Sequence, residues 1–288
     1  MDLSEVKTIG TGLIRPEGVM ALDGGILYTA DARGCCSRID ENGRTTFFGN
    51  VGGCPNGICI DTEGNCIIAN IGSGQVQSLK PDGVHDVILT EAGGRKMPAP
   101  NFPYLDFKGR LWVSNSTDRE DIDSALQDPL PDGCVVLIEK GQSRIVAEEI
   151  YFSNGLTLDK KEEYLYVAQT MKRDILRYKI GPDGSLGTAE VYGPTSLGDM
   201  GFPDGIAFDE AKNLWVTFPY WNAVGHITPN GDLVIALEDP KGKILRRPTN
   251  ICFGGKGRKT AFIGSLGGTS IPYFHLTNPG MRLIHQRE

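Results

Sequence analysis

Residues 202–209 read Phe202-Pro203-Asp204-Gly205-Ile206-Ala207-Phe208-Asp209, a turn that opens a short apolar strand. Altered forms of this stretch recur five more times along the chain. Each has an oxygen-bearing side chain at the place of Asp204, and we call these six residues the anchors: Glu17, Asn56, Asn101, Asn154, Asp204 and Thr249. Successive anchors are 39 to 53 residues apart. This spacing is typical of a fold built from repeated units of four strands.

The first repeat shows the pattern within one unit. Two apolar segments flank Asp23-Gly24-Gly25, and two further strands are separated by Glu41-Asn42-Gly43. Asn-Gly pairs favour tight hairpins because both residues tolerate positive φ. The repeats predict an all-β fold, a six-bladed β-propeller with four-stranded antiparallel blades around a central channel. We expect one domain over 1–288, with residues 5–11 pairing with the last blade to close the ring.

The composition narrows the classes of partner. A formal net charge of −7 over 288 residues argues against a nucleic-acid partner, which requires a basic face. No apolar run approaches the length of a membrane span, and Met1-Asp2-Leu3-Ser4-Glu5 lacks the regions of a secretory signal. We therefore expect a cytoplasmic protein without membrane contact, whose seven cysteines are reduced thiols. Because a propeller completes its own core, we expect a monomer or a weak homodimer.

The anchors predict a metal site. Residues at the entry to the innermost strand of each blade converge on the axis, where five anchors offer two carboxylates and up to three amides: Glu17, Asn56, Asn101, Asn154 and Asp204. Calcium and magnesium prefer such oxygen ligands, and the two negative charges match a divalent cation. The alternative is that Asn and Asp are only turn residues. Glu17 favours the site, because glutamate is a poor turn former.

The chain resembles the SMP-30/gluconolactonase/LRE-like family of six-bladed propellers over nearly its full length. Three segments carry the resemblance: Pro16-Glu17-Gly18, Ser153-Asn154-Gly155-Leu156 and Phe202-Pro203-Asp204-Gly205. The resemblance implies that Glu17, Asn154 and Asp204 are direct metal ligands. It also implies that Asn101 lies by the metal and the substrate.

Two positions differ from many sugar lactonases of this family. Ala99 stands where these often carry an arginine that contacts substrate hydroxyls, and Phe102 directly follows the third anchor. Both differences predict a substrate less polar than a free aldonolactone. A polar insertion, residues 117–131, contains Glu120 as a candidate for an acidic sugar contact, with Asp118 as the alternative. The predicted substrate-binding residues are Asn56, Asn101, Phe102 and Glu120.

The resemblance implies a metal-dependent lactonase acting on a small-molecule lactone or ester. One divalent cation, calcium first and magnesium, manganese or zinc as alternatives, would polarise the carbonyl for attack by water. Asp204 is the candidate general base, or only a ligand. The alternatives are an organophosphate or other ester hydrolase and a non-catalytic calcium- or ligand-binding propeller. A further alternative is carbon–carbon bond formation, as in strictosidine synthase-like propellers, which lack the metal set.

Overall fold

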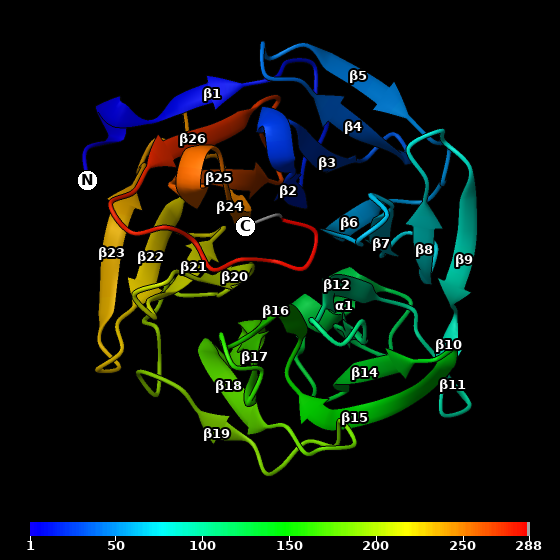
Figure 1. Cartoon of the computed structure of the whole chain (residues 1–288). Helices are drawn as coiled ribbons and strands as arrows, with labels where there is room; N and C mark the ends of the chain where they lie inside the picture. The colour runs from blue at the N-terminus through cyan, green and yellow to red at the C-terminus, as the bar shows by residue number, and fades with distance from the viewer. Residues whose placement is uncertain (287–288) are drawn as a thin grey trace.

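The computed structural model describes residues 1–286 as six four-stranded antiparallel sheets, arranged as blades around a central axis (Figure 1). The blades follow one another around the ring in chain order. The innermost strands are β2 (Val19–Ala21), β6 (Pro55–Ile60), β12 (Pro100–Leu105), β16 (Ser153–Leu158), β20 (Ile206–Phe208) and β24 (Pro248–Gly254). The predicted all-β, six-bladed propeller is confirmed.

Three further strands complete each blade. The first three blades add β3 (Leu27–Asp31), β4 (Cys35–Ile39) and β5 (Thr45–Phe48); β7 (Cys66–Asn70), β8 (Gln75–Leu79) and β9 (His85–Leu89); β13 (Leu111–Asn115), β14 (Gly133–Glu139) and β15 (Gln142–Ile150). The next two add β17 (Tyr164–Gln169), β18 (Asp174–Lys179) and β19 (Glu190–Val191); β21 (Leu214–Phe218), β22 (Ala223–Ile227) and β23 (Leu233–Glu238). A small hairpin, β10 (Glu91–Ala92) with β11 (Arg95–Lys96), joins the second and third blades.

The N-terminus closes the ring, as predicted. The sixth blade contains β25 (Thr260–Ser265) and β26 (Ile271–His275), and its outer strand is β1 (Lys7–Ile9). Within this pairing Ile9 lies opposite Ile271. The first and last parts of the chain therefore share one sheet, so the propeller has no open edge between its ends.

Glycine after an anchor lets neighbouring blades approach closely at the axis. A Cβ atom on Gly57 would lie 2.5 Å from the carbonyl oxygen of Asn101, and one on Gly155 would clash with the carbonyl of Asp204. The Gly155 amide instead donates to that Asp204 carbonyl at 3.1 Å. The turn motif read from the sequence thus has a packing cause, since only glycine permits this backbone contact.

Aspartates fix the hairpin that follows an innermost strand. Asp106 accepts a hydrogen bond from the Trp112 indole at 3.0 Å, and Asp209 accepts one from the Trp215 indole at the same distance. Both aspartates also accept the backbone amide four residues on. Equivalent strand positions therefore hold equivalent buried tryptophans, which orient the first two strands of the third and fifth blades.

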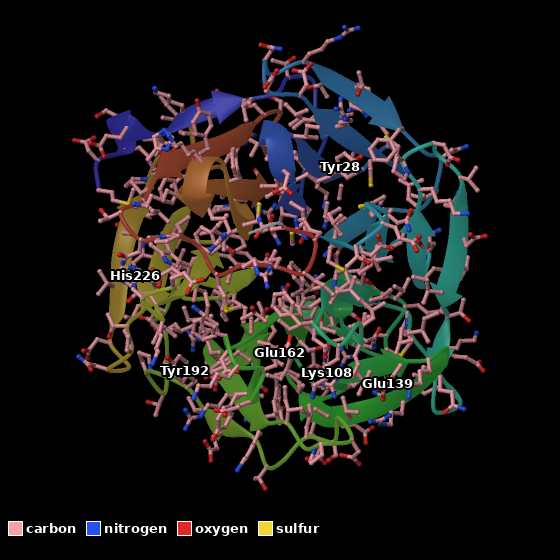
Figure 2. All side chains as sticks on the ribbon, in the orientation of Figure 1. Tyr28, Lys108, Glu139, Glu162, Tyr192 and His226 are labelled. Carbon is pink, nitrogen blue, oxygen red and sulfur yellow. The ribbon has the colours of Figure 1, made fainter. Side chains whose placement is uncertain are left out.

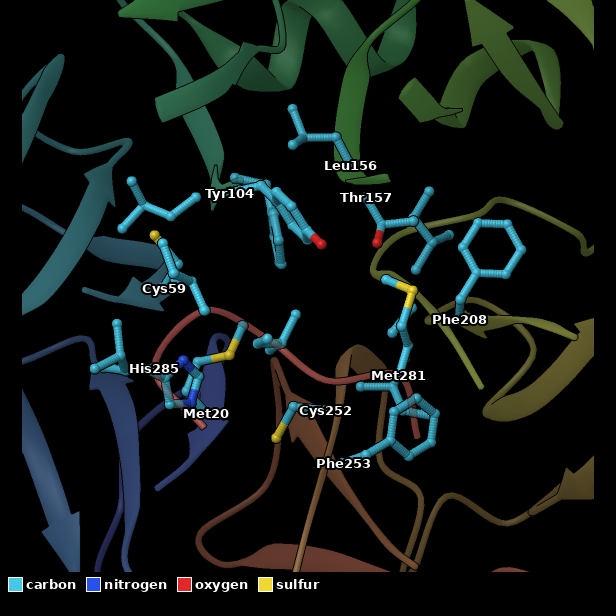
Figure 3. A pocket seen from close by; sticks show the side chains of 18 residues that line it. Met20, Cys59, Tyr104, Leu156, Thr157, Phe208, Cys252, Phe253, Met281 and His285 are labelled. Atoms are coloured by element: carbon cyan, nitrogen blue, oxygen red, sulfur yellow. The ribbon is translucent and has the colours of Figure 1, made fainter. Parts of the chain in front are cut away.

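The C-terminal segment covers one end of the channel. After β26 the chain turns under the ring, where the Met281 amide donates to the Phe208 carbonyl at 2.9 Å and Gln286 Nε2 donates to the Phe253 carbonyl at 2.8 Å. Beneath it lies an apolar cavity of about 30 Å³, with Met281 and His285 on its wall (Figure 3). These contacts lie at the far ends of the innermost strands, whereas the anchors lie at their starts. The anchor end of the channel is therefore the end left for ligands.

Helical structure is scarce in residues 1–286. The α-helix there is α1 (Ile122–Gln127), inside the insertion of the third blade, and the Asp121 carboxylate caps its N-terminus. No helix in the described part of the chain is long and apolar enough to cross a membrane. The sequence indicated a polar insertion over residues 117–131 but did not predict α1 within it.

Candidate metal centre

Five of the six anchors line one pocket of about 380 Å³ at the start of the innermost strands: Glu17, Asn56, Asn101, Asn154 and Asp204. All five side chains are buried. The sixth anchor, Thr249, does not line the pocket, and its hydroxyl donates to the Glu17 carbonyl at 2.9 Å. The repeat pattern thus brings five polar side chains together, while the sixth copy serves the closure between the first and last blades.

Two of these side chains have acceptor atoms without a donor. Glu17 Oε2 and Asn154 Oδ1 are buried and have no hydrogen-bond partner among the described residues. Asn154 is oriented by its Nδ2, which donates to Thr170 Oγ1 at 3.2 Å, and that hydroxyl donates to the Pro203 carbonyl at 2.8 Å. Burying such acceptors unpaired costs free energy. A cation in the pocket would satisfy both oxygens.

The composition of this donor set matches a hard cation. In residues 1–286, no group of three His, Cys, Asp or Glu side chains is placed to hold a metal. Here the two anchor carboxylates, Glu17 and Asp204, share a pocket with amide oxygens and with a third carboxyl group, that of Asp123. Calcium commonly takes carboxylate and amide oxygens together. The residues present therefore fit a divalent cation of the calcium or magnesium type.

Asn56 and Asn101 belong to a hydrogen-bond chain within the protein. Arg15 Nη2 donates to Asn56 Oδ1 at 2.8 Å, and Asn56 Nδ2 donates to Asn101 Oδ1 at 3.1 Å. Asn101 Nδ2 then donates to Ser116 Oγ at 2.9 Å. Because both amides already have protein partners, this arrangement favours positioning roles for them over direct metal contact.

Burial disfavours the ionised forms of the two carboxyl groups in the pocket when no cation is bound. Burial raises the pKa of Glu17 to about 7, partly offset by the charge of Arg15. Burial, followed by the charge of Glu17, raises the pKa of Asp204 well above its usual range. Two buried carboxyl groups that resist ionisation are expected where a compensating positive charge belongs.

These shifts predict how stability depends on pH in cation-free protein. The folded-state pKa of Glu17 lies above its ordinary value of 4.5, so the stabilisation is present at low pH and is lost as the pH rises towards about 7. Urea unfolding of chelator-treated protein at about pH 5 and about pH 8 should show the decline, on the order of 2 kcal/mol. The matched control is Glu17→Gln, in which the decline should be smaller. An equal decline in both proteins would contradict the prediction.

Two predicted substrate-binding residues lie outside this pocket. Phe102 occupies the position that glycine takes after other anchors, and its ring packs in the hydrophobic core and on the apolar cavity at the covered end of the channel. Glu120 is exposed and lines a neighbouring surface pocket, which shares Ile71 with the anchor pocket. Asp118, the alternative, forms an ion pair with Arg95. The geometry therefore gives no support for substrate contact by Phe102 or Glu120.

Several pocket residues lie outside the predicted set of metal ligands and substrate-binding residues. Arg15, Phe152, Phe202 and Arg247 stand two residues before an anchor, and all four line the pocket. The aligned repeats already pointed to this position, because Ala99 stands two residues before the third anchor, where many sugar lactonases carry an arginine that contacts the substrate. Ile122 and Leu126 of α1 also line the pocket, and nothing local in the sequence indicated that the insertion folds back over the channel.

The histidines lie away from the candidate centre. His226 is on β22 in the fifth blade, far from the axis (Figure 2), with its ring centroid 4.9 Å from that of Trp215. His285 contacts the Ala21 carbonyl at 3.0 Å under the covered end. None of the four histidines lines the anchor pocket. The carboxyl groups of Glu17, Asp123 and Asp204 are the proton acceptors of this kind among the residues that line the pocket.

Comparison with known proteins adds three likenesses. A 6-deoxy-6-sulfogluconolactonase of Pseudomonas putida is 29% identical over 124 residues, 43% of this chain and 41% of that protein. The protein STRICTOSIDINE SYNTHASE-LIKE 6 of Arabidopsis thaliana is 25% identical over 230 residues, 75% of this chain and 60% of that protein. The chain thus spans about 40 to 60% of the length of these relatives.

A solved structure of a luciferin-regenerating enzyme superposes with a TM-score of 0.81 at 18% identity, covering 98% of this chain and 99% of that one. At this identity the likeness concerns the fold. The family model described as the SMP-30/Gluconolactonase/LRE-like region matches residues 99–267, which is more than half of the chain. That span includes the third to sixth anchors and the whole of the third, fourth and fifth blades. The chain therefore belongs to the SMP-30/gluconolactonase/LRE-like family.

Proposed function

We propose that this protein is a metal-dependent lactonase that hydrolyses a small cyclic ester in the anchor pocket. The observation that carries the proposal is the meeting of Glu17, Asn154 and Asp204 in one buried pocket with two acceptor oxygens unpaired. Family membership and a lactonase among the relatives support this reaction class. The strictosidine synthase-like relative leaves carbon–carbon bond formation as a competing class. The pair of buried carboxyl groups favours hydrolysis.

Glu17, Asn154 and Asp204 would hold the cation, with calcium as the first candidate. When bound, a divalent cation supplies Lewis-acid polarisation of the ester carbonyl. Asp204 would accept a proton from water as the water oxygen bonds to the carbonyl carbon. The ring C–O bond then breaks, the leaving alkoxide takes up a proton, and one proton is released with the hydroxy carboxylate. Asn101, held by hydrogen bonds with Asn56 and Ser116, would orient the substrate.

The wall of the pocket suits a lactone of mixed polarity. Ile122 and Leu126 of α1, with Phe152, Phe202 and Leu266, add apolar surface to the polar anchors. A free aldonolactone has a hydroxyl on nearly every ring carbon, and the hydroxyls that face the apolar part of this wall would lose their hydrogen bonds to water. A lactone with fewer hydroxyls is therefore the expected substrate.

Hydrolysis of a lactone panel, followed with a pH indicator, tests the proposal. Chelator-treated protein should be inactive, and calcium, magnesium, manganese and zinc should then be restored one at a time. We expect turnover to return with at least one cation, and less hydroxylated lactones to react faster than gluconolactone. A strong preference for gluconolactone would overturn the prediction about polarity.

Other outcomes separate the competing functions. Cation binding without turnover on any lactone, but with hydrolysis of an organophosphate, would favour an ester hydrolase of that kind. Cation binding without any turnover would favour a binding protein. Absence of cation binding would mean that the anchors are turn residues alone and that the metal site does not exist.

A further inference from the structure

The anchor pocket contains two guanidinium groups in addition to its carboxyl groups. Arg15 is fixed by Asn56 Oδ1 at 2.8 Å and by longer contacts of 3.4 Å to Cys54 Sγ and the Pro55 carbonyl. Arg247, two residues before the sixth anchor, lines the same pocket. Its charge lowers the pKa of Asp204, against the larger effect of burial. Both arginines therefore act electrostatically on the carboxyl groups of the pocket.

Arg247 has no polar partner for its side chain. Within residues 1–286 its guanidinium group makes no hydrogen bond or ion pair, and its recorded contact is with the Tyr220 ring, 5.9 Å from the centroid. Tyr220 in turn lies 5.0 Å from Phe202, another pocket residue. The aromatic pair supports the arginine at the pocket rim and leaves its five N–H donors available.

Three of the side chains that line the pocket stand at residues with a left-handed backbone conformation. Arg15, Phe152 and Arg247 stand two residues before their anchors and have φ values of 48°, 63° and 52°. Residues other than glycine rarely adopt this left-handed conformation, and glycine would occupy it with less strain. All three positions instead carry large side chains that line the pocket. The strain at these turns is consistent with a function for the side chains themselves.

The charge balance favours an anionic ligand once the cation is present. Glu17, Asp123 and Asp204 contribute three carboxyl groups to the pocket wall, and Arg15 and Arg247 contribute two guanidinium groups. The net charge of these five groups is −1 when all are ionised, and a bound divalent cation would change the net charge of the pocket to +1. A neutral lactone would not use this excess, whereas a lactone with an additional anionic group would.

We propose that Arg247 forms an anion-binding subsite, so that the preferred substrate is a lactone that carries an anionic group, such as a carboxylate, in addition to the reacting ester. The inference rests on the proposed lactonase function and specifies its substrate class. The reacting carbonyl would face Asp204, and the anionic group would receive charge-assisted hydrogen bonds from the free guanidinium. Arg247 is thus a specificity-determining residue.

A matched pair of lactones tests the subsite. γ-Carboxy-γ-butyrolactone and its carboxamide differ in charge but hardly in shape. With calcium restored, kcat/KM for the acid should exceed that for the amide by at least about tenfold, and Arg247→Gln should reduce this ratio to near unity. The control is Arg246→Gln, because the Arg246 side chain packs beside Gly267 and does not line the pocket. This variant should retain the full ratio.

A binding measurement keeps the test independent of turnover. Tetrahydrofuran-2-carboxylic acid and tetrahydrofuran-2-carboxamide carry the same carboxylate and carboxamide groups on a ring that contains no ester. Titration calorimetry can therefore compare their binding even if no lactone reacts. We expect the acid to bind at least about tenfold more tightly, with the preference lost in Arg247→Gln. Equal binding, no binding of either ring, or a preference retained in Arg247→Gln would overturn the subsite. Turnover of both lactones at equal rates would overturn the subsite while leaving the lactonase proposal intact.

Discussion

Replacing Asp204 by asparagine should reduce kcat/KM for lactone hydrolysis by about a thousandfold. Asparagine has nearly the same shape and keeps one oxygen for the cation, but it can neither accept the proton from water nor supply a negative charge. Asp204 is buried in the pocket beside Glu17, and the charge of Glu17 contributes to raising its pKa. Initial rates on the best lactone of the panel measure the effect.

The matched control is Asp232→Asn in the same blade. Asp232 is exposed in the turn before β23, so this variant makes the same change of charge away from the pocket. It should retain normal activity. If Asp204→Asn is as active as this control, Asp204 has neither of the proposed roles.

The same variant separates the two roles of Asp204. Calcium affinity should be measured by calorimetry, and activity should be measured again at saturating calcium. Activity that recovers with excess calcium would identify Asp204 as a ligand alone. Calcium that binds without restoring activity would identify it as the general base as well, since only the proton acceptor is then missing.

Replacing Gly264 by alanine should destabilise the fold by roughly 3 kcal/mol. A Cβ atom at this position of β25 would collide with the backbone carbonyl oxygen of Glu17 and would lie 2.9 Å from Asn250 Cβ. Backbone cannot rotate away as a side chain can, so the first and last blades would have to move apart. The same carbonyl accepts the Thr249 hydroxyl, so the closure loses a hydrogen bond as well as its packing.

Urea unfolding compares this variant with Gly187→Ala. The nearest neighbour of a Cβ atom on Gly187 would be the Lys179 carbonyl oxygen at 3.6 Å, an ordinary van der Waals distance. This control should change the free energy of unfolding by less than about 1 kcal/mol. Equal stability of the two variants would show that the close approach of the first and last blades is not tight in solution.

The sequence by itself determined the blade count and the five polar anchors of the pocket. Each repeat carries its own turn, apolar strand and anchor, and these signals are local, so reading them requires no knowledge of distant contacts. Glycine after an anchor, as at Gly57 and Gly155, showed that the copies share one backbone geometry. From that geometry alone, five polar side chains could be predicted to meet on one axis.

Only the tertiary structure decided which side chains are available to a ligand. Thr249 stands at an anchor position and Phe102 directly follows one, yet the Thr249 hydroxyl donates to the Glu17 carbonyl and Phe102 packs towards the covered end. Arg247 and the helix α1 enter the pocket from loops whose direction depends on contacts with other blades. A repeat fixes where a backbone turn begins, because that is set by local conformational preferences. Which side chain finds a partner depends on the neighbouring blade, and that information exists only after the ring has closed.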